Sequence, residues 1–404
     1  MTSTEIHPEH TYSIPGNYTV TLNITSQEGV SYSLTKYNFI HVKENRFPVT
    51  FAATPTIGST PLTVEFYSTS HTGIEDWQWH FGDGTVSQVE MPVHTYTQTG
   101  TYDISLTITT PDGLYTSSQT AFIQVVDSET SLTVCAESCQ YTSIQAAIDA
   151  SENGNVIVVG DGIYQENIDF KGKAIWVHSL NGKNHTVIDG NLSASVVQFV
   201  QGEESQSILD GFTIQNGQSR FGGGILIDNA SSPVIQNCDI INNDALKRGG
   251  GIAIENNSSP SIINCLIDDN QSDYGAGLSY ARNSSGLAYA ITVVNNVAHV
   301  SGGAIFSYVD SEPVITDSTI HNNSANVQGG GLYAKGAIFE IIRTSIDNNT
   351  SIFGAAISFA DSTLPLLSQC RINHNTSTSD GVLYAVNTSI LKAVNTLITN
   401  NKCR

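Results

Sequence analysis

A repeat of 26 or 27 residues in the C-terminal two thirds of the chain limits its folds more than any other sequence feature. Aligning the segment before each Asn turn gives a column of Ile and Val only: Ile214, Ile240, Ile267, Val293, Ile320, Ile346, Ile372 and Ile398. A second column follows the Gly runs: Ile225, Ile252, Leu278, Ile305, Leu332, Ile357 and Leu383. Columns this regular indicate that equivalent residues stack, one repeat above the next.

The spacing of apolar residues inside each repeat predicts the kind of solenoid. Gly, Asn and Ser interrupt the pattern every few residues and the apolar period is 2, which excludes two amphipathic helices per repeat. We therefore predict an all-β chain with a right-handed parallel β-helix of roughly nine or ten coils, about 4.8 Å apart and on the order of 45 Å long. Before it, "TSIQAAIDASENG" (142–154) reads as one amphipathic helix that plugs the first coil.

The paired Asn and Gly residues of each repeat, as in "HNNSANVQGGG" (321–331), are interpreted as scaffold. Glycine lets the backbone take corner conformations with positive φ, and stacked Asn side chains can satisfy turn amides from coil to coil.

The segment 47–127 has short alternating strands separated by Gly, Pro and Asp, which is typical of an antiparallel β-sandwich. Its "WQWHFGDGT" (77–85) and "HTYTQTGTYDISLTI" (94–108) resemble the signature of the polycystic-kidney-disease (PKD) type domain, an immunoglobulin-like module. Asp83 between two glycines is expected to accept backbone hydrogen bonds in a tight turn. A calcium role for Asp83 is the weaker alternative, because one carboxylate is far from a six-oxygen shell.

Residues 7–24 repeat residues 91–108 at a constant offset of 84, so the chain opens in the middle of a second PKD-type domain. The hypothesis we favour is truncation of a longer, secreted protein; the alternative is completion by another chain through strand addition. The predicted domains are 1–45 (half of a PKD-type domain), 46–128 (PKD-type sandwich) and 129–404 (β-helix).

Composition and cysteine usage narrow the classes of partner and compartment. The formal net charge of -21 repels polyanions, so nucleic acid is an unfavourable partner. The sequence contains no run of 18 apolar residues, which a membrane-spanning helix would need. Cys135 and Cys139 are close enough for a local disulfide, with free thiols as the alternative. Asn-X-Ser/Thr sequons are dense, and those taken as glycosylation candidates, or simply as turn residues, are Asn17, Asn23, Asn184, Asn191, Asn229, Asn257, Asn283, Asn322, Asn348, Asn349, Asn375 and Asn387.

The repeat unit also resembles two known groups of β-helix proteins. Its Asn-Asn and Gly-Gly pattern is similar to the repeats of chlamydial polymorphic outer-membrane proteins, and "YTSIQAAIDASENGNVIVVGDGIYQENI" (141–168) resembles the start of pectate-lyase-like proteins. Together with PKD-type modules, this resemblance implies an extracellular or cell-surface protein of archaea or bacteria. It specifies architecture rather than activity.

Two weak catalytic constellations stand out. Asp228 and Glu255 fall one coil apart, a separation of about 5 Å that suits a retaining glycosidase pair, although stacked acids on a solvent turn are commoner. His321 and Asp347 occupy equivalent positions on neighbouring coils and resemble a general base with its carboxylate, in a column where polar turn residues are ordinary. Polygalacturonase-like motifs and an obvious calcium cluster of carboxylates are absent from the sequence.

We therefore expect a non-catalytic extracellular surface, envelope or matrix protein that spaces, adheres or self-assembles, with itself, other surface proteins or polysaccharide as partners. We expect no resident cofactor, with calcium as the alternative. The competing hypotheses are a carbohydrate-active lyase or hydrolase and a glycan-binding protein without turnover. Both would use an outer aromatic stripe, for which the candidates are Tyr280, Tyr308, Tyr333 and Tyr384, although core packing is the commoner role of such residues.

Overall fold

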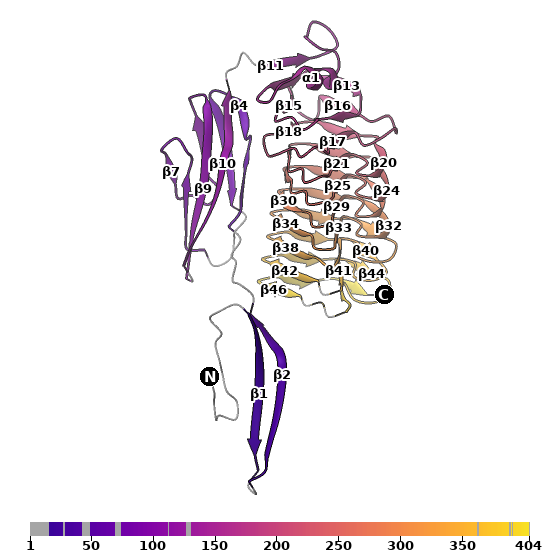
Figure 1. Cartoon of the computed structure of the whole chain (residues 1–404). Helices are drawn as coiled ribbons and strands as arrows, with labels where there is room; N and C mark the ends of the chain where they lie inside the picture. Colours follow the sequence, from indigo (N-terminus) through magenta and orange to yellow (C-terminus); the bar gives the residue numbers. More distant parts are fainter. Residues whose placement is uncertain are drawn as a thin grey trace. The chain divides into compact units, whose positions relative to one another are not determined.

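The computed structural model of the chain is almost entirely β-structure (Figure 1). It divides into two compact units, residues 1–48 and 49–404. The structure describes residues 16–26, 29–42, 49–68, 74–111, 113–126, 131–361, 363–387, 389 and 391–403.

The first unit contains an antiparallel hairpin of β1 (Gly16–Thr25) and β2 (Ser31–Val42). Next to the turn both strands alternate apolar and polar residues, so Leu22, Ile24, Tyr32 and Leu34 share an apolar face, whereas Lys36 lies opposite Val20. On the polar face the hydroxyls of Thr21 and Thr35 lie 3.0 Å apart.

The second unit begins with a β-sandwich of two sheets. One sheet has the strand order β4 (Ile57–Ser59), β10 (Gly113–Val126), β9 (Gly100–Thr110), β6 (Asp76–His80) and β7 (Val86–Ser87). The other contains β3 (Phe51–Thr54), β5 (Leu62–Ser68) and β8 (Val93–Tyr96). Trp79 is fully buried between them, with the rings of Phe51 and Phe66 at 5.4 and 5.5 Å.

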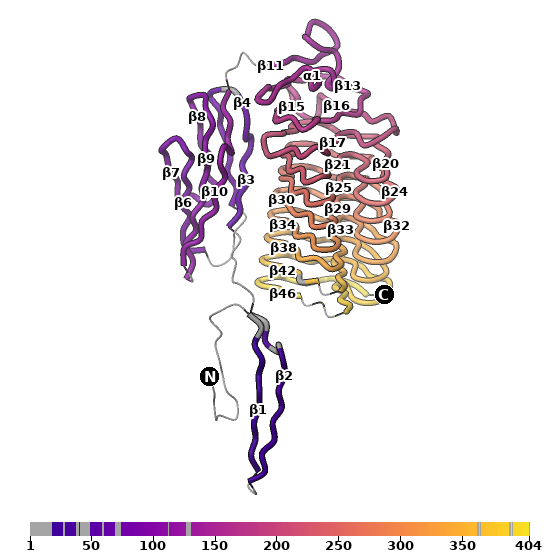
Figure 2. Tube along the Cα trace, viewed as in Figure 1, coloured from indigo at the N-terminus to yellow at the C-terminus, as the bar shows by residue number. Residues whose placement is uncertain are grey.

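The rest of this unit is a parallel β-helix, and successive colours in Figure 2 follow its stacked coils. In the described residues its strands form four parallel sheets. Sheet I contains β11 (Ser131–Val134), β12 (Val156–Val159), β15 (Trp176–Ser179), β18 (Ile208–Asp210), β22 (Val234–Gln236), β26 (Ser261–Ile263), β30 (Ser285–Tyr289), β34 (Glu312–Thr316), β38 (Ile338–Ile342), β42 (Leu364–Ser368) and β46 (Lys392–Val394). Sheet II contains β13 (Gly162–Gln165), β16 (Thr186–Asp189), β19 (Thr213–Gln215), β23 (Asp239–Ile241), β27 (Leu266–Asp268), β31 (Thr292–Val294), β35 (Thr319–His321), β39 (Ser345–Asp347), β43 (Arg371–Asn373) and β47 (Leu397–Thr399).

The other two sheets complete each coil. Sheet III contains β14 (Ile168–Asp169), β17 (Val197–Phe199), β21 (Ile225–Ile227), β25 (Ile252–Ile254), β29 (Leu278–Ala281), β33 (Ile305–Tyr308), β37 (Leu332–Lys335), β41 (Ile357–Ala360) and β45 (Leu383–Ala385). Sheet IV contains β20 (Gln218–Phe221), β24 (Asp244–Arg248), β28 (Gln271–Tyr274), β32 (Val297–Ser301), β36 (Ser324–Ala325), β40 (Thr350–Ser351), β44 (Thr376–Ser377) and β48 (Lys402–Cys403).

The columns seen in the sequence are the strand registers of the β-helix, which confirms the predicted fold. Ile214 pairs with Ile240, and Ile240 with Ile267, and all three are fully buried. Ile398, in the same column of the last coil, is 45% exposed. Burying one such side chain contributes roughly 1.5–3 kcal/mol, so the inward columns dominate the stability of the stack.

A ladder of buried Asn side chains lines one corner of the stack: Asn243, Asn270, Asn296, Asn323, Asn349 and Asn375. The Asn323 side-chain amide donates to the Asn349 Oδ1 at 3.0 Å and to the Val293 carbonyl at 2.9 Å. Each rung therefore satisfies the turn above and below it, as the scaffold interpretation predicted.

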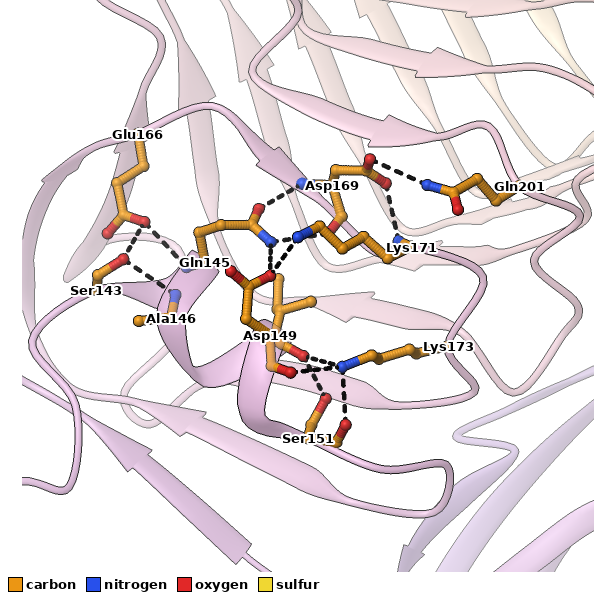
Figure 3. A network of polar contacts seen from close by, with 11 residues as sticks. Ser143, Gln145, Ala146, Asp149, Ser151, Glu166, Asp169, Lys171, Lys173 and Gln201 are labelled. Atoms are coloured by element: carbon orange, nitrogen blue, oxygen red, sulfur yellow. Dashed lines mark hydrogen bonds and ion pairs between the residues drawn. The ribbon is translucent and has the colours of Figure 1, made fainter.

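A short helix closes the first coil. Helix α1 (Ile144–Ala150) buries Ile144, Ala147 and Ile148 against the β-helix core. Figure 3 shows how polar groups hold its two ends: Glu166 accepts hydrogen bonds from the Ser143 hydroxyl at 2.8 Å and the Gln145 amide at 2.9 Å. Glu166 also accepts from the Ile144 amide at 2.9 Å. At the other end the Lys173 ammonium donates to the carbonyl oxygens of Ile148, Asp149 and Ser151 at 2.6–2.9 Å. The single helix is thus the predicted plug.

Within the second unit, the sandwich and the β-helix share contacts. The Tyr67 and Tyr289 ring centroids lie 4.5 Å apart, and the Thr56 hydroxyl donates to the Ser205 carbonyl at 2.5 Å. The predicted domain boundary near residue 128 falls outside the described residues.

Candidate functional site

A cluster of aromatic side chains lies on the outside of the β-helix, where sheets III and IV meet. We call Tyr274, Phe306, Tyr308 and Tyr333 the aromatic patch. Phe306 is its centre: its ring centroid is 5.3 Å from Tyr274, 5.7 Å from Tyr308 and 5.8 Å from Tyr333. The last two pairs are stacked, with interplanar angles of 21° and 25°.

Strand alternation and glycine place these rings on the outer surface. In β33, Ile305 and Ser307 are fully buried, so Phe306 and Tyr308 point away from the core; Phe306 is nevertheless only 5% exposed, and Tyr308 is half-buried. Gly275 has φ +59°, and a Cβ there would lie 2.6 Å from the Phe306 Cβ. The glycine corners therefore leave the space that the rings occupy.

The hydroxyl of Tyr333 stays protonated at neutral pH. Burial of this half-buried side chain raises its pKa, and the negative charge of Asp361 adds to the effect against the opposing Lys335. A neutral phenol beside stacked rings can donate a hydrogen bond while the rings pack on an apolar surface.

The four tyrosines predicted as one stripe do not lie on one surface. Tyr308 and Tyr333 belong to the aromatic patch, and Tyr384 pairs with Phe353 at 5.3 Å further along. The outer position predicted for Tyr280 is wrong: it is fully buried in the core, where burial raises the pKa of its hydroxyl. Tyr280 pairs with Ile254, an inward residue of the neighbouring coil.

Next to the aromatic patch, sheet IV carries two arginines, Arg220 and Arg248, beside the ring of Phe221. Phe221, Arg248 and Tyr274 are successive partners in register. The Arg248 guanidinium lies 4.8 Å from the centroid of the Phe221 ring, and that of Arg220 lies 5.2 Å from it. These are cation–π distances.

Glu255 and Asp228 are held by different partners. Glu255 is 2% exposed, and both its oxygens accept hydrogen bonds from Arg248 at 2.8 Å. Asp228 accepts from the Asn256 side chain at 2.7 Å and from the Asn229 amide at 2.6 Å. A carboxylate held in a bidentate, buried ion pair is an anchor rather than a nucleophile.

His321 and Asp347 are opposite each other in the paired strands β35 and β39. The Asp347 Oδ2 accepts from the Arg371 guanidinium at 3.1 Å and from the Ser345 hydroxyl. Both bonds end on Oδ2 and tie the coil of Asp347 to the following one, whereas Oδ1 is buried without a hydrogen-bond partner among the described residues.

Asp83 fastens the Gly-Asp-Gly turn of the sandwich. Its Oδ1 accepts from the Thr85 amide at 3.0 Å and the Thr85 hydroxyl at 2.6 Å, and its Oδ2 lies 2.7 Å from the His94 Nε2. Burial alone would raise the pKa of Asp83, but the hydrogen bonds from Thr85 and His94 together outweigh it and lower the pKa. The ring of His94 stacks on Phe81 at 4.4 Å.

The structure contains the Cys135–Cys139 disulfide. Among the sequons, Asn229, Asn257 and Asn283 are exposed, whereas Asn349 and Asn375 are fully buried in the Asn ladder. Glycosylation of these last two in the folded chain is ruled out, because their amides are hydrogen-bonded inside the stack. Asn184, Asn191, Asn322, Asn348, Asn387 and Asn23 are also exposed, and the Asn17 side chain is outside the described residues.

Over the described ranges, no group of three or more His, Cys, Asp or Glu side chains could hold a metal ion. In the same part of the chain, none of the helical structure has the length and apolar character needed to cross a membrane.

Sequence reasoning missed Tyr274, Phe306 and Arg248 as site residues. The signal was present: Phe306 follows the inward column residue Ile305, so period-2 alternation places it outside. Tyr274 and Arg248 each directly precede a Gly corner.

Comparison with known proteins identifies both parts of the chain. A family model described as PKD domain matches residues 45–125, and one described as right-handed β-helix region matches 116–299 and 274–404. The chain is similar to the PKD1 domain of Vibrio anguillarum Epp, with 29% identity over 19% of this chain and 93% of that one, and a TM-score of 0.17. Pectate lyase Pel9A shows 13% identity over 68% of this chain and 78% of that one (TM-score 0.39), and pectin methylesterase from carrot 15% over 68% and 88% (TM-score 0.31).

Proposed function

Because this chain belongs to the right-handed β-helix family, we propose that it is a non-catalytic structural component of an extracellular surface, envelope or matrix. The combination of a PKD domain with a β-helix is typical of extracellular surface proteins. In this role the stacked coils present regular outer faces for spacing or adhesion.

The observation that carries this proposal is the use of the candidate catalytic acids as structural anchors. Glu255 is bound by Arg248, Asp347 by Arg371 and Ser345, and Asp228 by the Asn256 side chain of the next coil. A catalytic acid or nucleophile needs an oxygen that substrate can reach. Both oxygens of Glu255 are bound by Arg248, and the Asp347 Oδ1, which has no hydrogen-bond partner, is buried. The chain instead uses these carboxylates to tie neighbouring strands together.

The Glu255→Gln variant tests this role. Replacement leaves the Arg248 guanidinium, whose side chain is 15% exposed, without its counter-ion and removes a charged hydrogen bond, so the free energy of unfolding should fall by about 2 kcal/mol. Chemical denaturation followed by circular dichroism measures the loss. The matched control is Glu312→Gln, an exposed glutamate, which should change the free energy by less than about 0.5 kcal/mol. A Glu255→Gln chain as stable as the parent would refute the anchor role.

A second candidate function, glycan binding without turnover, is supported by the aromatic patch. Phe306 is only 5% exposed, so the half-buried rings of Tyr274, Tyr308 and Tyr333 around it supply the apolar surface and the hydroxyls. Sugars bind to such platforms through their apolar C–H faces and their hydroxyl groups.

Affinity measurements on a panel of neutral and acidic polysaccharides test this candidate. Tyr333→Ala should weaken binding about tenfold, a loss near 1.4 kcal/mol, because it removes one stacked ring. Leu180→Ala, which removes an exposed apolar side chain elsewhere on the chain, is the control and should bind like the parent. Equal affinities of the two variants would exclude the aromatic patch as the binding surface.

A further inference from the structure

Three arginines gather beside the aromatic patch, although the chain has only 16 Lys and Arg against 37 Asp and Glu. The guanidinium groups of Arg220 and Arg248 lie 5.2 and 4.8 Å from the centroid of the same ring, that of Phe221. Arg248 and Arg282 share a second partner, because the Glu255 Oε2 lies 2.8 Å from the first and 3.5 Å from the second. We call Arg220, Arg248 and Arg282 the arginine group.

The positive charge of the arginine group exceeds the negative charge around it. Among the described residues, Glu255 is the one carboxylate within ion-pair distance of these arginines. Asp228, one coil before Glu255 in the same column, is held by the Asn256 side chain instead. Counting both carboxylates, one positive charge remains in excess. Cations held this close together repel each other, and an anionic group bound between them would relieve the repulsion.

Two of the three arginines are accessible to a ligand. Arg220 is exposed, and the Arg282 side chain is 54% exposed. Arg248 is only 15% exposed, and its Nε and Nη2 donate to Glu255 at 2.8 Å, so it is fixed in place. A guanidinium offers two parallel N–H groups that match the two oxygens of a carboxylate. Arg220 and Arg282 are therefore the residues that can receive an acidic group.

The arginine group is continuous with the aromatic patch. Arg248 pairs in register with Tyr274, and Arg282 directly follows Ala281, the register partner of Tyr308. Cations and half-buried tyrosine rings thus lie side by side over neighbouring coils. A sugar whose apolar face packs on a ring would place its charged substituents within reach of the arginines. The net charge of -21 disfavours densely charged polymers, so a ligand with widely spaced acidic groups fits this surface best.

We propose that the arginine group and the aromatic patch together bind a glycan in which uronic acid residues are separated by neutral sugars. Arg220 and Arg282 bind a carboxylate of the glycan, and the neighbouring neutral sugar packs against Tyr274 and Tyr308. Arg248 positions the site through Glu255. This inference rests on the second candidate function, glycan binding without turnover, and names its class of ligand.

The test uses the full 404-residue chain and two matched probes. One is a hyaluronan octasaccharide, in which glucuronic acid alternates with a neutral sugar, and the other is the same octasaccharide with its carboxylates converted to methyl esters. Isothermal titration calorimetry measures both affinities. We expect the acid to bind at least about tenfold more tightly than the ester at low ionic strength, and the difference to shrink as salt is added. This comparison needs no substitution in the chain.

Substitutions then locate the site. Arg220→Gln and Arg282→Gln should each weaken binding of the acid about fivefold and leave binding of the ester within about twofold, because each removes one charged contact. The control is Lys402→Gln, which removes the same charge from an exposed residue of β48, at the opposite end of sheet IV from Arg220 in β20. It should leave both affinities within about twofold.

Four results would overturn the proposal. Equal affinity for acid and ester would show that the ligand is not acidic, although glycan binding itself would stand. No binding of either probe or of the neutral polysaccharides would remove the glycan-binding candidate as well. A preference for the acid that neither Arg220→Gln nor Arg282→Gln reduces would place the carboxylate elsewhere. Tighter binding of an oligogalacturonate of equal length, in which every sugar is charged, would contradict the preference for spaced acidic groups.

Discussion

Asn323 illustrates how one polar side chain can stabilise several turns of the stack. It is fully buried, and its side-chain amide donates to Val293 and Asn349 while its Oδ1 accepts from the Asn296 amide at 3.0 Å. The neighbouring Asn322 is exposed and has φ +57°, a conformation that Asn tolerates well. The two residues of the Asn pair thus have separate roles, one in the core ladder and one at the corner.

At the same scale, Asp83 should make the stability of the sandwich depend on pH. Its pKa is lowered in the folded chain, so its hydrogen bonds contribute stability above the unfolded value near 3.9, and this contribution is lost as the pH falls through the folded value. We expect the difference in unfolding free energy between the parent and Asp83→Asn to be about 1 kcal/mol at pH 7 and to shrink below about pH 4. Denaturation monitored by tryptophan fluorescence at several pH values measures it. A difference that stays constant down to pH 2 would contradict the role of the ionised carboxylate.

At the scale of the element, glycines form the corners between strands, either because the backbone has a positive φ or because a side chain would not fit. Gly329 has φ +64°, and a Cβ there would meet the Leu332 carbonyl oxygen at 2.3 Å and the Tyr333 Cβ at 2.8 Å. Gly336 has nearly the same φ, +60°, but its nearest neighbour would be the Asp361 carbonyl oxygen at 3.8 Å. Glycine is therefore needed at Gly336 for its positive φ alone, and at Gly329 both for its positive φ and because a Cβ would collide with the backbone.

We expect Gly336→Ala to cost about 1 kcal/mol, the penalty for a left-handed conformation. Gly329→Ala should cost at least about 2 kcal/mol more, because the backbone of the corner must shift as well, and it should also displace Tyr333. Chemical denaturation of both variants gives the two free energies. Equal losses would show that the close approach at Gly329 is relieved without cost.

Sequence patterns predicted the elements better than the site, for reasons visible in particular residues. Columns such as Ile214 to Ile372 repeat because every coil needs the same inward side chain, so register follows from sequence alone. The partner of Glu255 could not be read in this way, because Arg248 precedes a corner whose turn brings the two together. Tyr280 lies two residues after inward Leu278, so period-2 alternation predicts the burial that the structure shows, and core packing rather than a sugar-stacking stripe is its role.

At the scale of the whole molecule, the chain joins a PKD-type sandwich to a β-helix closed at one end by α1. The interior is a continuous apolar core with polar ladders, and the outside differs from coil to coil. The aromatic patch and the Arg248–Glu255 pair belong to individual coils and are not repeated along the stack. A structural surface protein needs no more than such a scaffold and a specific exterior.

The most direct test of the central claim is an assay of the purified chain for turnover. The chain is incubated with a panel of acidic and neutral polysaccharides, with calcium and then with a chelator, and new reducing ends and unsaturated products are measured. The non-catalytic account predicts no product above a heat-denatured control on any substrate, whether or not the chain binds it. Product that forms with native chain, and is lost in the Glu255→Gln or Asp347→Asn variant, would contradict the account and make these carboxylates catalytic.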